Sequence, residues 1–134
     1  MRSIETSRAD RSILAARIVF AVALVFTLAM ALLPHPPTLE FDDFGDKFHH
    51  ALAFVTLTLL ASLAYPAARP LRIGERLSFL GAVIEVLQSI PALHRDCEAL
   101  DWVTDTIAII LALALVAGVR RLRRRRAVAR DAIG

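Results

Sequence analysis

The feature that most constrains this chain is a long apolar run at residues 13–33, which is interrupted by a single charge at Arg17. A membrane-spanning helix needs about 20 mostly apolar residues. Three shorter apolar blocks follow at residues 51–66, 77–90 and 103–119. A soluble domain would instead mix apolar and polar residues at the period of a helix or a strand. The sequence therefore predicts an all-α protein that lies in a membrane.

The basic residues indicate how many of these blocks cross the membrane. Fourteen of the 16 Lys and Arg residues lie in alternate segments, at residues 2–17, 67–76 and 120–134. The other two connections are acidic. Because positively charged flanks stay in the cytoplasm, the three basic segments are expected on the inside. The third block is short, but unless it crosses, the basic tail would lie outside. The pattern predicts a four-helix transmembrane bundle with both termini in the cytoplasm (N-in/C-in).

This topology divides the chain into three parts. They are a cytoplasmic N-terminal segment at residues 1–12, a membrane domain at residues 13–119 and an Arg-rich cytoplasmic tail at residues 120–134. The first block has a second interpretation as a cleaved secretory signal, because small residues end its apolar core. Its length and the nearby Pro34 favour a retained span, and cleavage would leave the remaining topology unchanged.

The basic tail has two interpretations. Basic runs neutralise the phosphates of nucleic acids, but no aromatic residue is interleaved with this one to stack on bases. A basic run directly after a span is typical of contact with anionic lipid headgroups. We therefore expect the lipid bilayer and anionic headgroups as partners, and no nucleic acid.

Polar residues gather where the second, third and fourth blocks meet the predicted outer surface. The set comprises Asp46, Lys47, His50, Glu85, Gln88, Arg95, Asp101 and Asp105. Spacings of three or four residues give each helix one polar face. On the last helix, Ala108 and Ala112 continue that face. Because all three faces belong to one leaflet, we expect them to meet in a polar pocket that opens to the extracytoplasmic side.

Energetics favours such a meeting. A carboxylate that faces lipid costs about 2.5–3.5 kcal/mol, so Glu85 must face the bundle, be protonated or pair with a cation. Ionisable residues inside a membrane point to a functional site. The alternative is a set of polar side chains that only hold the helices together through hydrogen bonds.

The same residues carry a resemblance to a known family. The segments DKFHHALAF and EVLQSIPALHRDCEALDWVTDTIAI resemble the VanZ-like family, whose pattern is D-K-x-x-H, then E-x-x-Q, an Arg, and D-x-x-x-N with two trailing glycines. The matching positions are Asp46, Lys47, His50, Glu85, Gln88, Arg95 and Asp101. Asp105 stands where the family has Asn, and Ala108 and Ala112 replace the glycines. The resemblance covers residues 41–118 and implies a small polytopic protein of the bacterial plasma membrane, in a family named for teicoplanin resistance.

Three functions are compatible with this set of residues. The first is an enzyme that acts on an envelope lipid or cell-wall intermediate. Its proton-transfer groups would be Glu85, His50 and Asp46, and its ligand-binding groups Lys47, Gln88, Arg95, Asp101 and Asp105. The second is a protein that binds such a ligand, or a glycopeptide-type antibiotic, without catalysis. The third is a proton-linked transporter, for which four short helices leave little room.

The same residues include groups that bind metal ions in other proteins. Asp46, His50, Glu85 and Asp101 offer oxygen and nitrogen ligands suited to Zn²⁺ or Mn²⁺. Their spacing matches no standard motif such as HExxH. We therefore expect neither a metal nor an organic cofactor.

Overall fold

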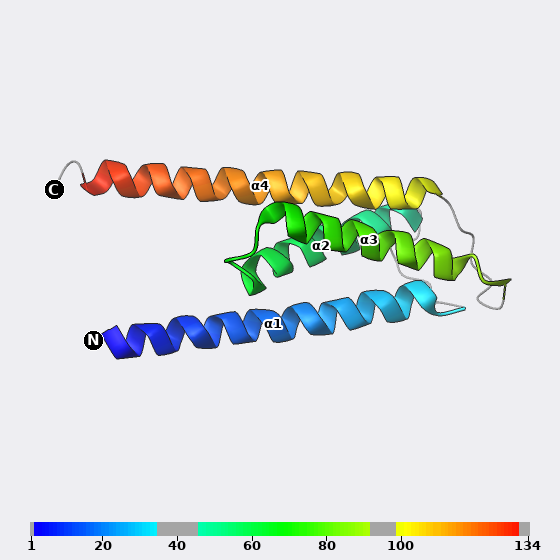
Figure 1. The fold of residues 1–134 in the computed structure, drawn as a ribbon, viewed down its shortest axis with the longest axis horizontal. Coiled ribbons are helices and arrows are strands. Elements are labelled where there is room, and N and C mark those ends of the chain that lie inside the picture. The colour runs from blue at the N-terminus through cyan, green and yellow to red at the C-terminus, as the bar shows by residue number, and fades with distance from the viewer. Residues whose placement is uncertain (1, 35–45, 92–98, 132–134) are drawn as a thin grey trace.

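The computed structural model describes residues 2–34, 46–91 and 99–131. Within these ranges the chain forms four α-helices and no strand, which confirms the predicted all-α class. The helices are α1 (Arg2–Leu32), α2 (Asp46–Ala64), α3 (Pro70–Gln88) and α4 (Ala99–Asp131). They lie lengthwise against one another, and α1 begins at the same end of the molecule at which α4 ends (Figure 1).

Each helix is longer than its apolar block. Helix α3 begins at Pro70 instead of Leu77, because proline is well suited to the first turn of a helix. Its 19 residues extend about 28 Å at 1.5 Å per residue, close to the ~30 Å thickness of a bilayer core. The basic tail continues α4, since arginine and alanine both favour helix. A short apolar block therefore does not mean a short helix.

The surface of the bundle supports a membrane location. Two helices are long and apolar enough to cross a membrane, over residues 10–32 in α1 and 99–130 in α4, and α2 carries a shorter apolar stretch at residues 48–64. Large apolar side chains are exposed on all four helices, among them Val25, Leu52, Phe79 and Leu111. Lipid tails would cover these side chains in a membrane.

The core lies along α2, which contacts both α1 and α4. Its largest fully buried apolar side chains are Phe54, Leu57, Ile84 and Ile109. Ala108 and Ala112 on α4 are buried, as predicted from their place on the same helix face as Asp101 and Asp105. Small side chains in such positions let neighbouring helices approach closely.

Two hydroxyl side chains on α2 are buried without being functional candidates. Thr58 donates a hydrogen bond to the carbonyl of Phe54 at 2.6 Å, and Ser62 donates to the carbonyl of Thr58 at 2.8 Å. Each hydroxyl is satisfied within its own helix, which removes the cost of burying it.

Candidate functional site

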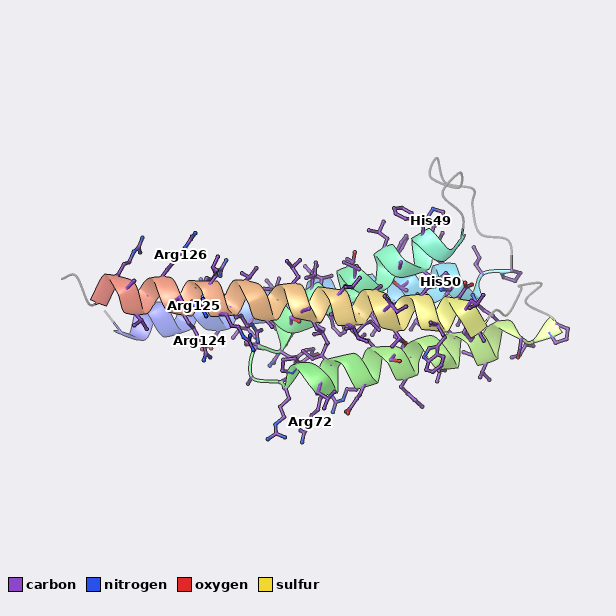
Figure 2. All side chains as sticks on the ribbon, turned by 90° about the horizontal axis from the view of Figure 1, so that it is seen from above. His49, His50, Arg72, Arg124, Arg125 and Arg126 are labelled. Atoms are coloured by element: carbon purple, nitrogen blue, oxygen red, sulfur yellow. The ribbon has the colours of Figure 1, made fainter. Side chains whose placement is uncertain are left out.

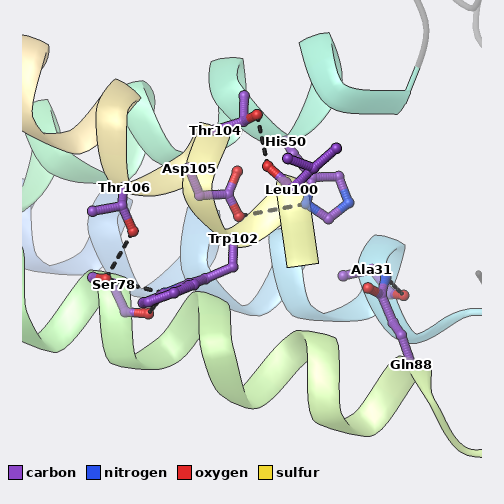
Figure 3. A network of polar contacts seen from close by, with 9 residues as sticks. All are labelled: Ala31, His50, Ser78, Gln88, Leu100, Trp102, Thr104, Asp105 and Thr106. Carbon is purple, nitrogen blue, oxygen red and sulfur yellow. Dashed lines mark hydrogen bonds and ion pairs between the residues drawn. The ribbon is translucent and has the colours of Figure 1, made fainter. Parts of the chain in front are cut away.

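The centre of the site is a contact between His50 on α2 and Asp105 on α4 (Figure 3). The Nδ1 atom of His50 lies 3.5 Å from Oδ2 of Asp105. The exposed fractions of the two residues are 9% and 1%, so this is a buried pair. Both residues lie in the first two turns of their helices, which begin at the same end of the bundle (Figure 1). The structure thus joins two side chains that are 55 positions apart in the sequence.

The second carboxylate oxygen of Asp105 has a different environment. Oδ1 is buried and has no hydrogen-bond partner among the described residues. Buried carboxylate oxygens in proteins ordinarily accept hydrogen bonds, so this atom is ready to accept one from a ligand or a water molecule. On the α3 side, Gly81 faces the carboxylate, and a Cβ atom on Gly81 would lie 3.5 Å from Oδ2.

Two further buried carboxyl groups lie one helical turn from Asp105 and Gly81. Asp101, 5% exposed, precedes Asp105 by one turn on α4, and Glu85, 6% exposed, follows Gly81 by one turn on α3. Helices α3 and α4 run in opposite directions, and Gly81 lies opposite Asp105. One turn along α3 therefore brings Glu85 to the level of Asp101. We call His50, Glu85, Asp101 and Asp105 the polar cluster.

Gln88 is buried on the same face as Glu85, as its spacing predicted. Its Nε2 donates a hydrogen bond of 2.9 Å to the carbonyl of Ala31, near the end of α1 (Figure 3). This contact connects α3 to α1 and gives Gln88 a structural partner within the bundle.

A second polar contact connects α3 to α4, and sequence reasoning did not assign it. The hydroxyls of Ser78 and Thr106 lie 2.9 Å apart. The indole Nε1 of Trp102 donates to the carbonyl of Ser78 at 3.1 Å and to its hydroxyl at 3.2 Å (Figure 3). Ser and Thr within apolar helices often bond across helices, but their partner depends on how the two helices are aligned.

The side chains of three predicted site residues are not among those that the structure describes. Arg95 lies outside the described residues, as do the side chains of Asp46 and Lys47. The backbone of α2 begins at Asp46, one turn before His50, so the two residues share a helix face. Within the described ranges, no three His, Cys, Asp or Glu side chains are grouped so that they could hold a metal ion.

Charge is distributed unevenly along the bundle. Figure 2 shows His49 and His50 toward one end, and Arg124, Arg125 and Arg126 at the other. An imidazole that contacts a buried carboxylate can accept and release a proton in an apolar environment.

Comparisons of the chain with family models, with curated proteins and with solved structures gave no match.

Proposed function

We propose that the chain is a VanZ-like membrane protein with four spans and both termini in the cytoplasm. The polar cluster is its functional site, at the outer leaflet, and acts by proton transfer on an envelope lipid or cell-wall intermediate. The observation that carries this proposal is the His50–Asp105 pair, an imidazole and a carboxylate buried 3.5 Å apart inside a bundle with an apolar surface.

The pair suggests how the proton transfer would work. A carboxylate beside Nδ1 favours the imidazole tautomer that carries its hydrogen on Nδ1, so Nε2 becomes the proton acceptor. Asp105 would then orient the ring and stabilise the imidazolium that forms, as carboxylates do beside catalytic histidines. The 3.5 Å separation is long for a hydrogen bond, and such contacts shorten when a ligand binds.

The remaining candidates have supporting roles in this proposal. Glu85 is a second buried carboxyl group, suited to give or take the other proton of the reaction. Lys47 lies three positions before His50 in the sequence and Arg95 six positions before Asp101, and both are suited to bind a phosphate or carboxylate of the ligand. Asp101 and Asp105 provide acceptors for its hydroxyl or amide groups.

A second candidate function is ligand binding without catalysis. The Oδ1 atom of Asp105 favours it, because a buried acceptor with no hydrogen-bond partner among the described residues can bind a ligand without any proton transfer. Proton transport is a weaker candidate. The hydroxyls of Thr58 and Ser62 donate to carbonyls of their own helix, so these hydrogens are already engaged.

The activity is tested with purified protein in nanodiscs and with lipid-linked cell-wall precursors. We expect wild type to bind and convert a precursor, and Glu85→Gln to lower turnover by about 100-fold or more, because a general acid or base contributes at least that factor. The matched control is Glu75→Gln, which makes the same change on the exposed face of α3. Equal turnover in all three proteins would exclude a chemical role for Glu85. Binding without turnover in wild type would support the second candidate.

The orientation is tested by cysteine labelling in intact cells. In a Cys97→Ser background, Ala99→Cys marks the start of α4 and Arg69→Cys marks the turn between α2 and α3; both positions are exposed. We expect a membrane-impermeant maleimide to label the first cysteine from outside and the second only after permeabilisation, because the positive-inside rule sets the topology. Labelling of both from one side would exclude the four-span arrangement.

A further inference from the structure

Two arginines meet the carboxyl end of α2 from different helices. The Nε atom of Arg17, on α1, donates a hydrogen bond of 3.2 Å to the carbonyl of Ala64. The Nη2 atom of Arg120, on α4, donates one of 3.0 Å to the carbonyl of Ser62. The last carbonyls of a helix lack partners within it and carry partial negative charge. Capping therefore accounts for one N–H of each guanidinium.

Most N–H donors of these two guanidiniums make no hydrogen bond to the described residues. A guanidinium has five N–H groups, and among the described residues each of these two uses one of them on a carbonyl. Arg17 also lies 5.4 Å from the ring centroid of Tyr65, which fixes its position without using an N–H. Neither arginine contacts a carboxylate in the described part of the chain.

Two guanidiniums at one helix end repel each other, and the carbonyls that they cap offset this only in part, because the end of a helix carries a fraction of a unit charge. The two carbonyls belong to residues that are about 3 Å apart along the helix axis, so both guanidiniums lie around a single helix terminus. One arginine would suffice as a cap. The second, with its spare donors, indicates a site for an oxyanion.

The surroundings favour a phosphate that is attached to a lipid. Helices α1 and α4 both extend beyond the turn between α2 and α3 on this side of the molecule (Figure 1). Exposed apolar side chains flank each arginine, with Leu14 and Ile18 on α1 and Val119 and Leu122 on α4. Acyl chains would lie along these residues, while the headgroup meets the arginines.

We propose that Arg17 and Arg120 bind the phosphate of an anionic phospholipid at the carboxyl end of α2, between α1 and α4. Basic sites between membrane helices bind phospholipid headgroups in this way, and the fork of arginine matches phosphate oxygens. The site lies away from the polar cluster and needs only that the bundle is in a bilayer. It does not depend on the proposed chemistry.

The test compares two double variants that each remove two positive charges. Arg17→Met with Arg120→Met removes the site, and Arg124→Met with Arg126→Met removes two exposed charges of the tail. The full chain in neutral detergent is titrated with phosphatidylglycerol, phosphatidylcholine or inorganic phosphate. Binding is read by native mass spectrometry and by the ligand-dependent rise in Tm within each variant. Reading the rise within each variant separates binding from any change in starting stability.

We expect the site variant to bind phosphatidylglycerol about tenfold more weakly than wild type, and the tail variant less than about threefold more weakly. If both double variants lose the same affinity for phosphatidylglycerol, the loss reflects net charge alone, and the proposed site is wrong. An equal rise in Tm with inorganic phosphate, or equal affinity for phosphatidylcholine, would overturn the anionic lipid as its ligand. If the site variant does not fold, Arg17→Lys with Arg120→Lys replaces it. These lysines keep the charges but lose the fork, so binding as tight as in wild type would also overturn the proposal.

Discussion

Asp105→Asn is expected to lower turnover of the lipid-linked substrate by about 10³- to 10⁴-fold while the helices stay folded, as when the carboxylate behind a catalytic histidine becomes an amide. The variant restores the residue that the VanZ-like family has at this position, so the expected loss rests on the contact between His50 and Asp105 that this chain makes. The change keeps the size of a side chain that is 1% exposed and packs beside Gly81. It removes the charge that favours a hydrogen on Nδ1 of His50, and an amide NH₂ in its place would donate to that atom. Nε2 would then carry the hydrogen and could no longer accept a proton.

The measurement is a comparison of kcat across single and double variants. His50→Gln should lose about as much as Asp105→Asn, and the double variant should lose little more, because groups that act as one unit are not additive. Asp10→Asn, on the exposed face of α1, is the control for the same chemical change. If Asp105→Asn lowers Tm but leaves kcat at the wild-type value, the pair only joins α2 to α4, and the binding function becomes the better account.

The helix faces were predictable because they depend only on spacing. Residues three or four positions apart share a face in any α-helix, so the stripe from Asp101 through Asp105 to Ala112 and the pair of Glu85 and Gln88 follow from the sequence. The structure confirms that these residues face inward, because each of them is buried. The cost of exposing a carboxylate to lipid gives the same answer from energetics.

How the helices are aligned with one another was not predictable in the same way. Which residue of α4 meets His50, and whether Ser78 reaches Thr106, depends on packing between helices and not on period. Arg17 shows this most clearly. In the sequence it only interrupts an apolar run, and its role becomes visible when α1 lies against the end of α2. Helix α3 begins seven residues before its apolar block, at Pro70, and α4 continues through the basic tail, because an apolar block marks the surface that lipid would cover and not the extent of the helix.

Phe54→Ala is expected to lower the free energy of unfolding by about 3 kcal/mol, the lower end of the range for Phe→Ala in a packed core. Phe54 is 1% exposed and belongs to the buried core, and its Cζ atom lies 3.4 Å from where a Cβ of Gly81 would be. Lipid and detergent are as apolar as the core, so the transfer contribution is small. The cost arises from the contacts that the surrounding atoms lose.

Phe79→Ala is the matched control, because it makes the same change at a side chain on α3 that is 71% exposed. Thermal or denaturant unfolding in one detergent should show a loss below about 0.5 kcal/mol for this variant. Similar losses at the two positions would mean that Phe54 is not packed as described. Phe54 also follows His50 by one turn, and both Phe54 and Asp105 lie beside Gly81. The space that Phe54→Ala leaves would therefore loosen the packing around the polar cluster. Turnover should fall together with stability in Phe54→Ala but not in Phe79→Ala.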